Sequence, residues 1–141
     1  MSLLTDQVGR ALSPEGPLAA CWPGFKARRG QSDMADAVAQ VIEHGGSLVV
    51  EAGTGVGKTF AYLVPLLLAG PRALVSTATK ALQDQLFSRD LPRLVQALNL
   101  PVRVALLKGR SSYLCIHRMA QARHHPQAQQ LVWQRALARV E

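Results

Sequence analysis

Hydrophobic and polar positions follow two distinct patterns along the chain, one typical of helices and one typical of strands. Between Ser32 and Gly45 the apolar residues recur at helical spacing, which predicts a helix capped by Ser32 and stopped by Gly45 and Gly46. Further helices are predicted from Lys58 to Ala69, over residues 79–88 and over residues 91–98. Pro65 lies inside the first of these and is expected to kink it.

Short, apolar, β-branched runs separate these helices. Residues 47–51, 72–77 and 102–107 each have the length and composition of a buried strand. Strands that alternate with helices imply right-handed crossovers and a parallel sheet, so the predicted fold class is α/β.

At the two ends of the chain, neither the helix pattern nor the strand pattern is strong. Residues 1–12 are weakly amphipathic, and residues 13–24 are rich in Pro and Gly, which predicts a helix followed by a loop. Beyond Gly109, residues 113–123 and 127–139 are predicted to be helices with basic faces, with no strand between them.

Composition narrows the class of protein. The chain has 141 residues, 48% of them hydrophobic, so it has enough apolar material for a folded core. Its longest apolar run, residues 61–70, is too short to span a bilayer, and the N-terminus lacks the pattern of a secretory signal. The only cysteines are Cys21 and Cys115, so no disulfide framework is expected. A cytoplasmic protein without a membrane partner is predicted.

Charge is distributed unevenly along the chain. Residues 1–70 hold five Lys/Arg and six Asp/Glu, whereas residues 71–141 hold eleven and three, so the whole formal excess of +7 comes from the second half. Such a field favours polyanions, and an aromatic content of 5% makes contact with the phosphate backbone a better fit than base stacking. A basic surface that serves only solubility is the alternative from charge alone.

A glycine-rich segment between a predicted strand and a predicted helix carries the strongest signal. It fits the pattern G-x-x-x-x-G-K-S/T except at its first position, and it consists of Ala52, Gly53, Thr54, Gly55, Val56, Gly57, Lys58 and Thr59. Glycines let backbone N–H groups turn toward phosphates at a helix N-terminus. Lys58 then supplies charge to the β- and γ-phosphates of ATP, and the Thr59 hydroxyl is placed to bind Mg²⁺. An ordinary glycine-rich turn is the alternative.

Nucleotide hydrolysis also needs a carboxylate at the end of another strand. After Thr59 the chain has only Asp84, Asp90 and Glu141, and none of them follows an apolar strand. Glu51 ends the strand before the loop and is expected to point away from the phosphates. The sequence therefore predicts a nucleotide cradle without its hydrolytic partner.

Four segments together resemble a known family: FKARRGQSDM, EAGTGVGKTFAYLVPLLL, VSTATKALQDQL and LLKGRSSYLC. Their order and spacing are similar to the start of the iron-sulfur DNA helicases of superfamily 2, the DinG and XPD type, with the bacterial YoaA-like branch most alike. The resemblance implies part of a RecA-like P-loop lobe over residues 25–109, after an N-terminal helix and loop at residues 1–24. Residues 110–141 correspond to the helical start of an iron-sulfur domain.

The resemblance assigns roles to further residues. Gln31 matches the glutamine that reads adenine, with Arg28 and Met34 beside it, and an exposed polar residue at a helix start is the alternative. Thr77, Thr79 and Lys80 match a segment that holds a DNA phosphate, for which simple helix capping by Thr79 is the plainer account. Arg110 falls at the entry to the cluster domain, where it would contact DNA.

The same resemblance makes Cys115 the first thiolate ligand of a 4Fe-4S cluster, although Ser112 stands where the family has Asn. A cluster needs four thiolates, and no cysteine follows Cys115. Cys21 is interpreted instead as a small buried apolar side chain. His117 and the adjacent pair His124 and His125 have no spacing suited to zinc.

The leading hypothesis is the N-terminal, ATP-binding part of a DNA helicase that moves 5′ to 3′ on single strands and acts in DNA repair or replication. Expected partners are single-stranded or forked DNA and a replication-associated protein. Alone, the 141 residues are expected to bind nucleotide without efficient hydrolysis. The alternatives are another P-loop NTPase, such as a nucleotide kinase or transporter ATPase, and a non-enzymatic module that binds DNA or a partner.

Overall fold

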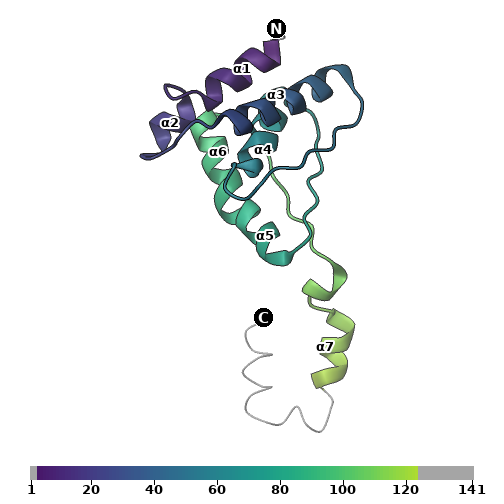
Figure 1. The fold of residues 1–141 in the computed structure, drawn as a ribbon. Helices are drawn as coiled ribbons and strands as arrows, with labels where there is room; N and C mark the ends of the chain where they lie inside the picture. Colours follow the sequence, from purple (N-terminus) through teal and green to yellow (C-terminus); the bar gives the residue numbers. More distant parts are fainter. Residues whose placement is uncertain (1–2, 124–141) are drawn as a thin grey trace. The chain divides into compact units, whose positions relative to one another are not determined.

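The computed structural model describes residues 3–123, and these fall into two compact units that divide between Val104 and Ala105. The first unit is helical (Figure 1). Its helices are α1 (Leu3–Leu12), α2 (Pro17–Cys21), α3 (Arg29–His44), α4 (Lys58–Ala69), α5 (Lys80–Gln85), the π-helical turn η1 (Leu86–Asp90) and α6 (Leu91–Leu98).

Helix α3 begins earlier than its hydrophobic pattern predicts. The backbone N–H groups of Gln31 and Ser32 already donate to the carbonyl of Arg28, which is the extended N-cap residue. The prediction that Ser32 caps this helix is therefore wrong: Ser32 lies inside its first turn. The predicted stop is confirmed, because Gly45 ends the helix with a φ of 77°, a conformation that favours glycine.

A short helix forms where the sequence predicts only a loop. Pro17 starts α2, since a proline in the first turn lacks only an N–H that the helix leaves unbonded. Leu18 is fully buried, whereas Cys21 at the end of the helix is exposed. The interpretation of Cys21 as a buried apolar side chain is therefore wrong, because the turn that buries Leu18 leaves Cys21 on the surface.

The two helices predicted over residues 79–98 form one continuous helical run (Figure 1). Thr79 caps its start, because the Thr79 hydroxyl accepts a hydrogen bond from the Leu82 N–H at 3.2 Å. Asn99, with a φ of 50°, ends the run. Between α5 and α6 the π-helical turn of η1 replaces the predicted break, and it buries both Leu86 and Asp90.

Small residues set the packing of the core. Ala35 and Ala39 on α3 and Ala61 on α4 are completely buried, and such small side chains let two helices approach closely. Helix α1 packs against both α3 and α4 through an apolar stripe, and the N–H of Leu4 donates to Glu43 at 3.2 Å. This packing brings the start of α3 to the start of α4.

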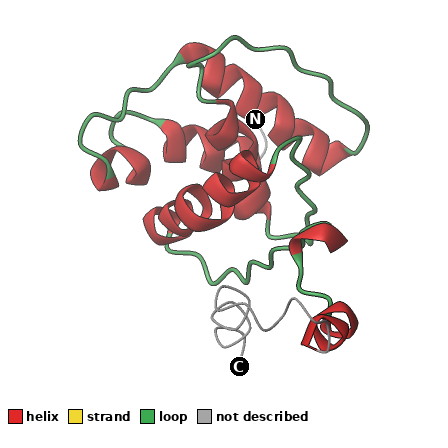
Figure 2. Ribbon diagram, turned by 90° about the horizontal axis from the view of Figure 1, so that it is seen from below, coloured by secondary structure: helices red, strands yellow, loops and turns green. Residues whose placement is uncertain are grey.

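The three segments predicted as strands are not strands. Residues 47–51, 72–77 and 102–107 have no regular secondary structure, and residues 3–123 contain no strand, as the absence of yellow in Figure 2 shows. Val49 and Leu74 are 96% and 93% exposed. The predicted parallel sheet is therefore not formed in the described part of the chain. A strand needs a partner to satisfy its backbone groups, whereas a helix satisfies its own.

The described part of the second unit contains a 3₁₀ turn, η2 (Arg110–Ser112), and helix α7 (Ile116–Arg123). The helix predicted from Tyr113 starts at Ile116 instead, because Tyr113 is extended and its hydroxyl accepts a hydrogen bond from the Lys108 N–H at 2.8 Å. The helix predicted over residues 127–139 lies outside the described residues. Among residues 3–123 no helix has the length and apolar character needed to cross a membrane.

Candidate functional site

The glycine-rich segment folds as a tight loop that ends at the first residue of α4. Gly55 and Gly57 adopt positive φ angles of 82° and 91°, which side chains rarely tolerate. Gly57 is the N-cap of α4 and offers no side-chain cap to the first N–H groups of the helix. The loop therefore presents a helix N-terminus without a side-chain cap, which suits a phosphate group.

Lys58 folds back over this loop. Its Nζ donates to the carbonyl oxygens of Ala52 at 2.8 Å and Gly53 at 2.7 Å, and the side chain remains exposed. These contacts hold a positive charge above the loop glycines. The structure thus brings the lysine to the same place as the helix N-terminus, as the sequence pattern requires.

Gln31 reaches the same loop from α3. Its side chain is 3% exposed, and its Nε2 donates to the carbonyl of Gly57 at 3.0 Å. Gln31 lies on the buried face of α3 because it is one turn before Ala35 and two turns before Ala39. The plainer interpretation of Gln31 as an exposed polar residue is therefore wrong. With Nε2 bonded to the loop, the Oε1 atom is the group that can accept a further hydrogen bond.

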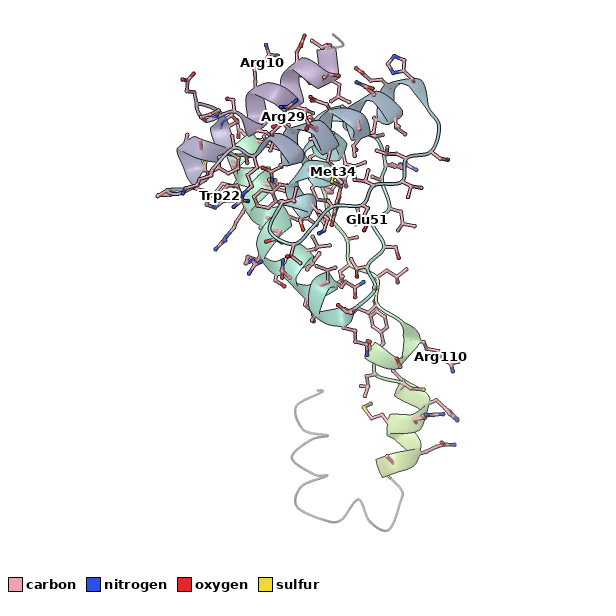
Figure 3. The ribbon with its side chains drawn as sticks, in the orientation of Figure 1. Arg10, Trp22, Arg29, Met34, Glu51 and Arg110 are labelled. Atoms are coloured by element: carbon pink, nitrogen blue, oxygen red, sulfur yellow. The ribbon has the colours of Figure 1, made fainter. Side chains whose placement is uncertain are left out.

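The neighbouring residues lie at the start of α3 and in the segment that contains the loop. Arg28 is exposed as the N-cap residue of α3, and Met34 lies one turn into the same helix, where Figure 3 labels it. Glu51, on the extended segment that leads into the loop, is exposed. Val56 packs close to Gly30, where an added Cβ would lie 3.5 Å from the Val56 Cγ1. Thr54, in the turn of the loop, is also exposed.

Tyr62 lies one turn after Thr59 on α4, and its pKa is perturbed. Burial raises the pKa of Tyr62, the hydrogen bond from Thr59 opposes the rise, and the negative charge of Asp90 adds to it. Tyr62 therefore keeps its proton at neutral pH. The i, i+3 spacing of Thr59 and Tyr62 was the only signal in the sequence for this pair.

Asp90 is the most enclosed carboxylate near these helices. Its side chain is 7% exposed, and it accepts hydrogen bonds from Arg89 Nε at 2.9 Å and Gln85 Nε2 at 3.0 Å. It belongs to η1 and does not follow a strand, as the sequence indicated. Sequence reasoning missed its burial, because a π-helical turn leaves no clear mark in the hydrophobic pattern.

Three of the four candidate DNA residues lie at the start of the α5 run. The Thr77 hydroxyl donates to the carbonyl of Thr79 at 3.3 Å, Thr79 caps α5, and Lys80 is its exposed first residue. Capping by Thr79 is therefore confirmed. Arg110 belongs to the second unit, where it begins the exposed 3₁₀ turn (Figure 3).

The described residues do not form a site for an iron-sulfur cluster. Cys21 and Cys115 are both exposed and belong to different units, and a cluster needs four thiolates. No group of three His, Cys, Asp or Glu side chains suited to a metal ion occurs within residues 3–123. This chain's own cysteines therefore do not fit a complete cluster.

A glycine-rich loop that ends at a helix N-terminus, with a lysine folded over it and a threonine next in line, is typical of a P-loop nucleotide-binding protein. Residues 31–134 match the DEAD/DEAH box helicase family. The chain belongs to this family, and within it to the DinG/XPD type and the YoaA-like branch. The resemblance seen in the sequence is confirmed.

Individual relatives support the assignment. The chain is 59% identical over 109 residues to the ATP-dependent DNA helicase YoaA of Escherichia coli, which covers 77% of the chain and 17% of the relative. It is 50% identical over 116 residues to YoaA of Haemophilus influenzae, covering 82% and 18%. It is 53% identical over 104 residues to the ATP-dependent helicase DinG of Mycobacterium tuberculosis, covering 68% and 16%. The chain thus spans less than a fifth of the length of these relatives.

Proposed function

We infer that the chain is the ATP-binding part of an ATP-dependent DNA helicase that acts in DNA repair or replication. The observation that carries this proposal is the loop at the start of α4, where Lys58 and the helix N-terminus converge and Gln31 is fixed against Gly57. Lys58 would bind the β- and γ-phosphates of ATP. Thr59 would bind Mg²⁺, which when bound neutralises phosphate charge.

Gln31 is proposed to select the base. Because its Nε2 donates to Gly57, its Oε1 is left to accept a hydrogen bond. Adenine carries a 6-amino group that can donate to this oxygen, whereas guanine carries an oxygen there. The geometry therefore favours ATP over GTP, with exposed Arg28 at the edge of the same site.

Nucleotide binding by the full chain tests the proposal. Isothermal titration with Mg²⁺ should show binding of ATP and weaker binding of GTP. Lys58→Ala should weaken ATP binding about 10- to 100-fold, because it removes charge-assisted hydrogen bonds to phosphate. Lys26→Ala removes another exposed lysine, outside the loop, and should leave the affinity unchanged. Equal losses in the two variants would contradict the role of the loop.

Hydrolysis is expected to need residues beyond this chain. In residues 3–123 the acids near α4 and the α5 run are Asp84 and Asp90, on helix and π turn rather than at a strand end. The 141 residues should therefore bind ATP without efficient hydrolysis. Hydrolysis that DNA stimulates in this chain, and that Lys58→Ala abolishes, would contradict this expectation.

The DNA would be single-stranded or forked, and movement along it 5′ to 3′, as the resemblance implies. Thr77, Thr79, Lys80 and Arg110 are proposed to contact its phosphates. The basic half of the chain supports this proposal, and backbone binding should weaken steeply with salt and depend little on base sequence. If the affinity for DNA does not change with salt, the basic half of the chain does not contact DNA phosphates and its charge only makes the surface soluble.

Cys115 is proposed to supply one of four thiolates to a 4Fe-4S cluster in a longer protein. Its exposure in the second unit is compatible with ligation, and the remaining ligands would come from outside this chain. A cytoplasmic location and a replication-associated protein partner complete the proposal.

A further inference from the structure

A pocket of about 140 Å³ lies on the first unit where α2 packs against α6, the two helices labelled in Figure 1. Its lining residues come from the end of α2 and from α6, and none belongs to the glycine-rich loop: they are Cys21, Trp22, Arg93, Gln96 and Ala97. Small-molecule sites usually enclose roughly 300–1,000 Å³. This smaller pocket is therefore suited to a single side chain of another protein.

One wall of the pocket is an aromatic ring that the fold already holds in place. Trp22, labelled in Figure 3, is half-buried, and its ring stacks on Phe60 with centroids 5.3 Å apart and an interplanar angle of 24°. The N–H of Trp22 donates to the Leu18 carbonyl at 3.0 Å, and its carbonyl accepts from the Phe25 N–H at 2.9 Å. A ring fixed in this way loses little conformational freedom when a partner binds. Trp22 and Ala97 thus offer a preformed apolar surface.

Arg93 supplies the only charged side chain of the pocket. It is exposed and forms no ion pair with any other of residues 3–123. Asp90, one turn earlier in the same helical run, is bonded to Arg89 instead. Gln96 lies one turn after Arg93 and adds an amide N–H₂ donor to the same pocket. A guanidinium and an amide together suit a carboxylate, whereas a DNA backbone is bound by several cations.

We propose that this pocket binds a segment of a partner protein in which an aliphatic side chain stands next to a carboxylate. The aliphatic side chain occupies the space beside Trp22 and Ala97, and the carboxylate accepts hydrogen bonds from Arg93 and Gln96. Trp and Arg are the residue types that most often carry the binding energy of protein interfaces. The inference rests on the proposed function in one respect, because it gives a chemical identity to the protein partner proposed there, but it does not require ATP.

Nuclear magnetic resonance of the full chain tests the pocket directly. The probe is N-acetyl-leucine, which joins a carboxylate to an aliphatic side chain, and N-acetyl-leucinamide is the matched probe without the charge. The indole N–H signal of Trp22, identified by its loss in Trp22→Phe, should shift with N-acetyl-leucine at millimolar concentrations, as expected for one bound side chain. The affinity for the amide should be about 3- to 10-fold lower, because the charge-assisted hydrogen bonds are lost.

Two arginine variants assign the carboxylate. Arg93→Gln should lower the affinity for N-acetyl-leucine about 3- to 10-fold and leave the affinity for the amide unchanged. Arg103→Gln removes another exposed arginine of the same unit, outside the pocket, and should change neither affinity. Both variants lose one positive charge, so a general effect of charge would be the same in both. Equal binding of the two probes, or equal losses in the two variants, would overturn the proposal.

A single-stranded thymidine oligonucleotide tests the other occupant. If it shifts the Trp22 signal and N-acetyl-leucine does not, this surface contacts DNA and the proposed protein site is wrong. If no probe shifts the signal but the chain binds ATP with Mg²⁺, the pocket proposal fails and the proposed ATP site stands. If N-acetyl-leucine binds as expected and ATP does not, the pocket proposal stands and the proposed ATP site fails.

Discussion

The contact between Gln31 and Gly57 makes a strong prediction about a single methyl group. A Cβ added at Gly57 would lie 2.2 Å from Gln31 Nε2 and 2.9 Å from Gln31 Cδ. Real Cβ atoms do not approach other atoms so closely, so either the buried amide or the loop must move. Gly57→Ala therefore breaks the hydrogen bond that joins α3 to the loop.

Three contributions to the loss can be estimated separately. A residue with a side chain in the left-handed conformation costs about 1–2 kcal/mol. The lost hydrogen bond adds about 0.5–1.5 kcal/mol, and this value stays low because the Gly57 carbonyl also accepts from the N–H groups of Phe60 and Ala61. Displacing the Gln31 amide adds about 1–3 kcal/mol of overpacking. We expect Gly57→Ala to destabilise the first unit by about 2.5–6.5 kcal/mol in total.

Gly55→Ala is the matched control. Gly55 has a similar positive φ of 82°, but an added Cβ there meets no atom within 4 Å. It should therefore show only the conformational cost of about 1–2 kcal/mol. Urea unfolding followed by circular dichroism gives the free energy of each variant.

Combining Gly57→Ala with Gln31→Ala tests the mechanism directly. Removing the Gln31 amide also removes the clash, so the glycine substitution should then cost no more than Gly55→Ala does. The expected coupling between the two positions is about 1.5–4.5 kcal/mol, because Gln31→Ala removes both the hydrogen bond and the overpacking. If Gly57→Ala costs the same in both backgrounds, the steric argument is refuted and the strain lies in the loop alone.

Two other predictions concern stability. Burial raises the pKa of Asp36 above its ordinary value of 3.8, and the charge of Asp33 adds to the rise, so the ionised carboxylate disfavours the folded state at neutral pH. Asp36→Asn should therefore raise the urea midpoint at pH 7. This gain should disappear as the pH falls below about 4, where the carboxyl of the wild type is protonated. An equal gain at pH 7 and below about pH 4 would contradict the raised pKa of Asp36. The rings of Trp22 and Phe60 stack with centroids 5.3 Å apart, so Phe60→Leu should cost about 0.5–1.5 kcal/mol beyond the loss of buried area. Phe87→Leu, which lies outside this stack, serves as the control. Equal losses of unfolding free energy in the two variants would contradict a contribution from stacking.

Local patterns in the sequence predicted the helices well and the extended segments poorly. Residues 47–51 have the composition of a buried strand, yet Val49 is 96% exposed. Composition can indicate that a segment is suited to a β-strand, but strand pairing depends on residues far away in the chain. Helix α2 shows the opposite error, since the Pro- and Gly-rich composition around Pro17 predicts a loop although Pro17 begins a helix.

The sequence by itself determined the glycine-rich loop before α4, the Thr79 cap and the stop of α3 at Gly45, because each depends on backbone groups within a few residues. Only the tertiary structure decided that Gln31 is buried. Its contact with Gly57 spans 26 residues and requires the close approach of α3 and α4. The burial of Asp90 likewise depends on how the π turn η1 packs within the first unit. Such contacts follow from the shape of the packed core, which no local periodicity encodes.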